Sequence, residues 1–281
     1  MDGESLINDP SVNNIRTPIL SLQDMNSNNN NSQHPDNLDS VSYDDSETIR
    51  DKDYSESLDQ MTENQIRQAS LPIDTFGLSI VAKIYSKMWS KRDEAIDELK
   101  AFLKSHMTKY SGNNLSSLTE GSNEYPDPKA VLRAVSSILQ KILNDSVLAV
   151  FKKALDLHQF LLIDYCESMA IPRGDALTQV EKLFPTLLMR TGDNSGRVRE
   201  CAKNAVIQMF NWKLIQCYCE YWYVMLKPIQ PSTLDRLAIS RTEIVKNLYG
   251  KLIAKYSDIS FFKLEQIVEF ATSSIKHKSA E

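Results

Sequence analysis

Histidine and cysteine are the residue types in this sequence that most often act as proton carriers, nucleophiles or metal ligands. The four histidines are far apart along the chain: His34, His106, His158 and His277. None of them has a partner at the spacing of a metal site or of a catalytic triad. Cys217 and Cys219 are two residues apart, so on a helix their side chains point in different directions. Because the sequence also lacks a glycine-rich phosphate loop, it predicts a protein that is not an enzyme and that needs neither a metal nor a cofactor.

A second group of side chains is suited to binding rather than to catalysis. It combines one tryptophan with basic and small polar residues: Trp89, Lys91, Arg92, Arg190, Asp193, Asn194, Arg197, Arg199, Lys227, Lys276, His277 and Lys278. A tryptophan offers a large apolar contact area, and a row of cations attracts an acidic partner. Each residue alone has a simpler interpretation, Trp89 as a core aromatic at a helix end and the cations as solvated residues near helix C-termini. A binding surface is favoured only if the group shares one edge of the fold.

Apolar residues three and four positions apart predict the helices that would place this group. The stretches that predict helices are 73–88, 95–103, 128–142, 147–165, 177–188, 198–209, 213–227, 234–250 and 262–275. Asp74 and Ser90 are placed to cap the first two helices, with Asp93 supporting the second cap, and Pro128 can begin the third. With 8 glycines in 281 residues there is little room for hairpins. The sequence therefore predicts an all-α fold.

Two helices joined by a short turn recur about every 35–50 residues, which is typical of an α-solenoid of HEAT-like pairs. One pair alone cannot bury its apolar face, so neighbouring pairs must stack. Antiparallel pairing puts the turn within every pair at the same edge of the stack. A row along one edge is therefore expected from residues 89–92, 144–145, 190–197, 227–233 and 276–278.

Charge separates the N-terminal segment from the rest of the chain. Residues 1–70 contain 14 acidic and 4 basic residues, a net charge of −10, whereas residues 71–281 have a net charge of +5. Asn, Ser and Asp dominate residues 1–61, so we expect a disordered acidic tail there and a folded domain over residues 62–281. A net charge of +5 without interleaved aromatic residues argues against a nucleic-acid partner.

The sequence also bears on compartment and membranes. No apolar run reaches the roughly 18–20 residues that span a bilayer, and the N-terminal MDGESLINDP is typical of neither a secretory signal nor a transit peptide. We therefore expect a cytoplasmic chain with reduced cysteines, including Cys166 and Cys201, and no membrane partner.

Two stretches of the sequence are distinctive: FGLSIVAKIYSKMWSKRDEAI, which begins at Phe76, and LMRTGDNSGRVR, which begins at Leu188. Both resemble the TOG-domain family of the centrosomal protein of 104 kDa. The resemblance covers about residues 71–281. It implies a stack of HEAT repeats, an armadillo-type superhelix, whose turns within the repeats bind the αβ-tubulin dimer. It also implies a place in the cytoskeleton at the ciliary tip, centriole or basal body, where other ciliary or centriolar proteins are further partners.

The resemblance also implies which residues contact tubulin. By position in the motifs and turns they are Trp89, Lys91, Arg92, Asn144, Asp145, Arg190, Thr191, Asn194, Arg197, Lys227, Lys276 and Lys278. Among them, Trp89 corresponds to the first-turn tryptophan that lies against tubulin. The family completes a fifth repeat, whereas this sequence ends where the fifth turn begins, so we expect a C-terminally incomplete domain with an unpaired last helix.

A generic HEAT-repeat adaptor is the alternative function. Such an adaptor binds a peptide or protein in the concave groove formed by the second helices of the pairs. The two hypotheses differ in the surface that binds, because tubulin binding uses the edge formed by the turns.

Overall fold

The computed structural model describes residues 61–112, 126–214, 219–255 and 264–277. Every regular element within these ranges is a helix, which confirms the all-α prediction. The elements are α2 (Glu63–Gln68), α3 (Ser70–Phe76), α4 (Leu78–Tyr85), α5 (Trp89–Gly112), α6 (Pro128–Ile142), α7 (Leu148–Phe160), the π-helical η2 (Leu161–Tyr165), α8 (Cys166–Ser168), α9 (Arg173–Arg190), α10 (Gly196–Met209), α11 (Cys219–Met225), α12 (Asp235–Lys255) and α13 (Leu264–Lys276). Apart from Met61, the acidic segment expected to be disordered lies outside the described residues.

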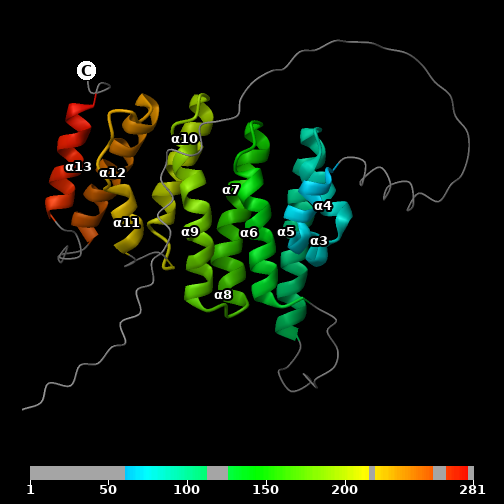
Figure 1. The fold of residues 1–281 in the computed structure, drawn as a ribbon. Helices are drawn as coiled ribbons and strands as arrows, with labels where there is room; N and C mark the ends of the chain where they lie inside the picture. The colour runs from blue at the N-terminus through cyan, green and yellow to red at the C-terminus, as the bar shows by residue number, and fades with distance from the viewer. Residues whose placement is uncertain (1–60, 113–125, 215–218, 256–263, 278–281) are drawn as a thin grey trace, which may run out of the picture. The chain divides into compact units, whose positions relative to one another are not determined.

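The helices pack side by side in two layers. In the first layer α3, α6 and α9 are consecutive neighbours, and in the second layer α5, α7, α10 and α12 follow one another. The layers are joined within the pairs α4–α5, α6–α7 and α9–α10. Figure 1 shows these helices standing side by side in a row, with α13 beside α12. This arrangement confirms the predicted solenoid of HEAT-like helix pairs.

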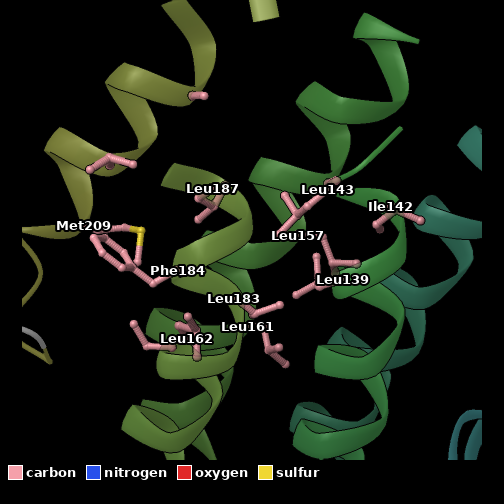
Figure 2. Close-up of a cluster of buried hydrophobic side chains, with 14 of the residues drawn as sticks. Leu139, Ile142, Leu143, Leu157, Leu161, Leu162, Leu183, Phe184, Leu187 and Met209 are labelled. Atoms are coloured by element: carbon pink, nitrogen blue, oxygen red, sulfur yellow. The ribbon is translucent and has the colours of Figure 1, made fainter. Parts of the chain in front are cut away.

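The hydrophobic core lies between the two layers. The apolar positions predicted for the helix that begins at Pro128 are all buried, from Val131 to Ile142. Figure 2 shows leucines of α6, α7 and α9 gathered in one cluster, among them Leu139, Leu157 and Leu183. Burying one such side chain stabilises a fold by about 1.5–3 kcal/mol. Because neighbouring pairs share these contacts, each repeat holds the next in place.

The first helix pair differs from the prediction at a break in its first helix and at both ends of its second helix, which runs on past residue 103 to Gly112. Instead of one helix over residues 73–88, the chain forms α3 and α4 around Gly77, whose φ of 82° suits a residue without a Cβ atom. Asp74 therefore lies inside α3 and is not its N-cap. The next helix, α5, begins at Trp89, so Ser90 lies in its first turn and does not cap it. The turn ends early because the Ser86 hydroxyl accepts a hydrogen bond from the Met88 amide at 3.2 Å.

The last helix is packed on one side only. Phe270 of α13 is buried, and the helix contacts α12. This contact is with the preceding pair, so the absence of a partner within its own pair stays a prediction. Leu264, Val268 and Ile275 of the same helix are exposed.

Candidate binding rim at the helix turns

The turns within the helix pairs lie at one edge of the stack (Figure 1), as antiparallel pairing predicts. They are residues 86–88, 143–147, 191–195 and 226–234, and residue 277 follows α13 at the same edge. We call these residues and the helix ends beside them the rim, which comprises residues 86–92, 141–147, 189–199, 226–236 and 275–277.

The first turn presents two large apolar side chains to solvent. Met88 is 58% exposed and Trp89 is 52% exposed. The backbone of this turn is fixed by Arg92, whose guanidinium donates to the carbonyls of Ser86 at 2.8 Å and Lys87 at 3.0 Å. Trp89 thus projects from the first residue of a helix whose preceding turn is fixed by hydrogen bonds.

The same arginine joins the first turn to the second. Arg92 Nε lies 2.6 Å from Asp145 Oδ2, and Nη2 lies 3.1 Å from Oδ1, so the two side chains form a two-point ion pair. Both are largely shielded, with side-chain exposures of 14% for Arg92 and 7% for Asp145. Asp145 Oδ1 also accepts from the Val147 amide at 2.8 Å. Arg92 and Asp145 therefore hold two neighbouring turns in register.

Arg190 joins the second turn to the third. Its Nη2 donates to the Asp145 carbonyl at 2.7 Å, and its Nη1 lies 2.8 Å from an oxygen of Asp193. The guanidinium also lies 4.9 Å from the centre of the Phe151 ring, a cation–π contact. Like Arg92, Arg190 therefore makes its main contacts within the protein.

The third turn is closed by a buried hydroxyl and a close backbone approach. The Thr191 side chain is fully buried and donates to the Leu188 carbonyl at 2.6 Å. A Cβ atom on Gly192 would lie 2.8 Å from Cβ of Leu237. Glycine at this position allows the third turn to pack directly against the first turn of α12.

Further contacts connect the remaining turns. The Arg236 guanidinium donates to the side-chain oxygen of Asn194, and a ring nitrogen of His277 lies 3.1 Å from the Thr233 carbonyl. Arg241 donates to the carbonyls of Met225 at 2.9 Å and Lys227 at 2.6 Å. Every turn of the rim is therefore connected to the next through at least one polar contact.

The structure divides the residues predicted from the sequence into two groups. Four of them have inward-facing or largely shielded side chains: Arg92, Asp145, Arg190 and Thr191. The others present all or part of their side chains to solvent: Trp89, Lys91, Asn144, Asn194, Arg197, Lys227 and Lys276. Lys278 lies outside the described residues.

Sequence reasoning missed several exposed residues of the rim. Met88 precedes Trp89, and Leu234 of the fourth turn is 59% exposed. Lys141 and Arg236 are exposed cations at helix ends beside the turns. Lys141 lies in the last turn of a predicted helix, and its position directly before the second turn was the signal available in the sequence.

The histidines that could serve chemistry are engaged in the core. His106 Nδ1 lies 3.0 Å from the Tyr165 hydroxyl, and burial lowers the pKa of this histidine. His158 packs against Trp212, and complete burial lowers its pKa to about 4. Burial raises the pKa of the Cys166 thiol to about 12, which keeps it protonated. Within the described ranges, no three metal-binding side chains are grouped as a metal site would require.

The face formed by the second helices carries ion pairs between neighbouring helices. Lys153 of α7 lies 2.6 Å from carboxylate oxygens of both Asp93 and Asp97 on α5. Lys203 of α10 lies 2.6 Å from Glu243 of α12. These five charges are therefore matched to one another. Among the helices described, none is long and apolar enough to span a membrane.

Comparison with known proteins gives a consistent result. The family model described as "Centrosomal protein CEP104, TOG domain" matches residues 66–281. Proteins named centrosomal protein of 104 kDa are 29% identical in Mus musculus and 27% identical in Homo sapiens, each over 221 residues that make up 79% of this chain and 22% of the relative. The chain thus spans about a fifth of the length of the curated relatives it matches.

Solved structures show the same similarity. The structure of the TOG domain of human Cep104 superposes with a TM-score of 0.64 at 27% identity and covers 78% of both chains. A second structure, named CEP104 TOG domain, gives the same TM-score and identity.

Proposed function

The chain belongs to the TOG-domain family of the centrosomal protein CEP104, and from this premise we propose that its rim binds the αβ-tubulin dimer. A TOG domain is a binding module and not an enzyme. The relatives are named centrosomal proteins, so the proposal places the module in the cytoskeleton at the centrosome or centriole, and more narrowly at the basal body or ciliary tip with other ciliary or centriolar proteins.

The exposure of Trp89 carries this proposal. Trp89 is 52% exposed directly beside Met88, which is 58% exposed, and exposed tryptophans often dominate the energy of an interface. The turn before it is already ordered by Ser86 and Arg92. Docking Trp89 in an apolar site on tubulin therefore loses little conformational entropy.

The charge of the rim supports an acidic partner. Its cations are Lys87, Lys91, Arg92, Lys141, Arg190, Arg197, Arg199, Lys227, Arg236 and Lys276, and its acids are Asp145, Asp193 and Asp235. Asp145 and Asp193 are paired within the rim to Arg92 and Arg190. The rim therefore has a net charge of +7, more than the +5 of residues 71–281 as a whole. This positive edge would speed the encounter with tubulin and orient it.

The predicted contact residues then divide between two tasks. Lys91, Arg197, Lys227 and Lys276 offer their charges to tubulin, while Asn144 and Asn194 offer amides. Thr191 and the arginines paired with Asp145 and Asp193 hold the turns in the spacing at which those side chains can dock together.

The adaptor alternative requires the face of the second helices. There, Lys153 and Lys203 are engaged by carboxylates of neighbouring helices. A peptide bound on this face would compete with these ion pairs. Trp89 and the excess of positive charge are both on the rim, and they favour the edge over the groove.

Substitution of Trp89 tests the proposal. In binding of residues 1–281 to unpolymerised tubulin, Trp89→Ala should cost about 2 kcal/mol or more, roughly thirtyfold in Kd. Tyr110→Ala is the matched control, because Tyr110 is a 45% exposed aromatic at the other end of the same helix. Lys152→Glu, on an exposed position of α7, tests the groove. If Trp89→Ala binds like the wild type while Lys152→Glu abolishes binding, the adaptor function replaces this one.

A further inference from the structure

A hollow of about 460 Å³ opens at the rim between the first and second turns. Its apolar lining comes from Ile84 and Ile142. The polar part of its lining is contributed by Ser86, Arg92, Lys141, Asn144, Asp145 and Ser146. The hollow is close to Trp89 in the chain, since Arg92 is three residues further along the same helix and three-residue neighbours share a helix face.

The two cations that line the hollow, Arg92 and Lys141, differ in whether they have an anionic partner within the described part of the protein. Arg92 is engaged by the Asp145 carboxylate and by two turn carbonyls. Lys141 has no carboxylate within ion-pair distance among the residues that the structure describes, and its Nζ lies 4.3 Å from the centre of the Tyr85 ring. The positive charge available to a partner in this hollow is therefore that of Lys141.

The surroundings of Lys141 favour the arrival of a negative charge. Partial burial and repulsion by Arg92 lower the pKa of Lys141, and attraction by Asp145 opposes this only in part. The attraction of a carboxylate placed beside Nζ would oppose both effects and favour the charged form. Ser146 adds an O–H donor to the same lining, and Asn144 adds an amide that also donates to the Gln140 carbonyl at 2.8 Å. The two isoleucines are almost completely buried, so the surface that meets an acidic side chain is mainly polar.

We propose that this hollow is a socket for one aspartate or glutamate side chain of tubulin, with Lys141 as the residue that receives its carboxylate. The inference rests on the proposed function and adds a residue that neither the turn motifs nor the family resemblance indicated. A single carboxylate fits the site better than a phosphate, because Asp145 on the wall of the hollow repels a second negative charge. Trp89 then supplies the apolar contact, and Lys141 fixes the orientation beside it.

The test uses residues 1–281 and unpolymerised αβ-tubulin at two ionic strengths. Lys141→Met keeps the aliphatic part of the side chain and removes the charge, and it should weaken binding about tenfold at low salt. Lys141→Arg should bind within about threefold of the wild type because it keeps the charge. The control is Lys152→Met, an exposed lysine of α7 outside the rim, which should change Kd by less than about twofold.

Thermal unfolding of the same proteins separates docking from folding. A lowered lysine pKa means that the charged form is less stable in the folded protein than in the unfolded chain. The melting temperature of Lys141→Met should therefore equal or exceed that of the wild type, whereas a purely structural residue would lose stability.

Each outcome decides between the socket and the broader function. If Lys141→Met binds like the wild type, or no worse than Lys152→Met, the socket is wrong although the rim still binds tubulin. If the wild type and all variants fail to bind tubulin, the proposed function and the socket are both wrong. If Lys141→Met unfolds at a lower temperature than the wild type and Lys141→Arg binds tubulin as weakly as Lys141→Met, Lys141 is a structural residue and the socket is again wrong.

Discussion

Asp145 connects three turns of the rim although its side chain is almost entirely shielded. Its carboxylate binds Arg92 from the first turn, and its backbone carbonyl binds Arg190 from the third. These contacts join residues that are 53 and 45 positions apart. Asp145 therefore fixes the spacing of the first three turns of the rim, although its own carboxylate is not exposed to a partner.

Replacement of Asp145 should therefore cost stability. Asp145→Ala leaves the shielded Arg92 guanidinium without its carboxylate, and we expect a loss of about 2 kcal/mol in the free energy of unfolding. Asp156→Ala is the control, because Asp156 is 77% exposed and lies 3.9 Å from Lys100. Such a surface pair contributes at most about 0.5 kcal/mol. Urea unfolding measures both, and equal losses would show that Asp145 has no special role.

At the scale of single residues, the sequence predicted which positions belong to the turns but not what each does. The motif around Trp89 indicated an exposed aromatic in the first turn, and Trp89 is exposed. It could not indicate that Arg92 and Arg190 face inward, because both bind Asp145 of the second turn, which only the stacking of the repeats brings within reach. Lys141 was missed for a related reason, since its hollow forms only when the first two pairs stack.

At the scale of elements, apolar periodicity predicted the helix pairs and their order. It failed at the first pair, where Gly77 divides one predicted helix into α3 and α4. The apolar stripe continues across this break, because residues on both sides still face the core. Periodicity reports which side of a segment is buried, whereas the break depends on the backbone freedom of one glycine. The start of α5 was misplaced because contacts of Ser86 and Arg92 close the turn sooner than the capping pattern suggests.

Gly192 determines how closely the third turn approaches α12. An alanine Cβ would lie 2.8 Å from Leu237 Cβ and 3.2 Å from its Cα, and that backbone atom cannot rotate away. Gly192→Ala should therefore reduce stability by about 1–3 kcal/mol. Gly174→Ala, in the first turn of α9 with nothing within 4 Å of the new Cβ, should be neutral or slightly stabilising. Unfolding curves with similar midpoints for the two variants would contradict this account.

At the scale of the whole molecule, the helix pairs are stacked on one another, so a buried group in one repeat affects the stability of the whole fold. His158 of α7 is such a group, since it is fully buried and packed on Trp212, which follows α10. Its pKa is lowered to about 4, and Nε2 has no hydrogen-bond partner among the described residues. The folded protein therefore keeps this ring neutral at pH values where an exposed histidine is charged.

The stability of the whole fold should consequently fall as the pH drops from about 6.5 to 4. In this interval the unfolded chain takes up a proton at His158, whose ordinary pKa is 6.5, while the folded chain does not. The unfolded state then binds more protons, so the free energy of unfolding rises with pH and is fully retained above about pH 6.5. The difference between the pKa of His158 in the unfolded and folded states corresponds to about 3 kcal/mol in the free energy of unfolding.

His158→Leu removes the titrating group, so this variant should lose less stability than the wild type between pH 7 and pH 4, as measured by urea unfolding. Part of the slope should survive, because burial also lowers the pKa of His106. Identical pH dependence of the two proteins would mean that His158 can become charged inside the fold, and the packing against Trp212 would then have to admit water.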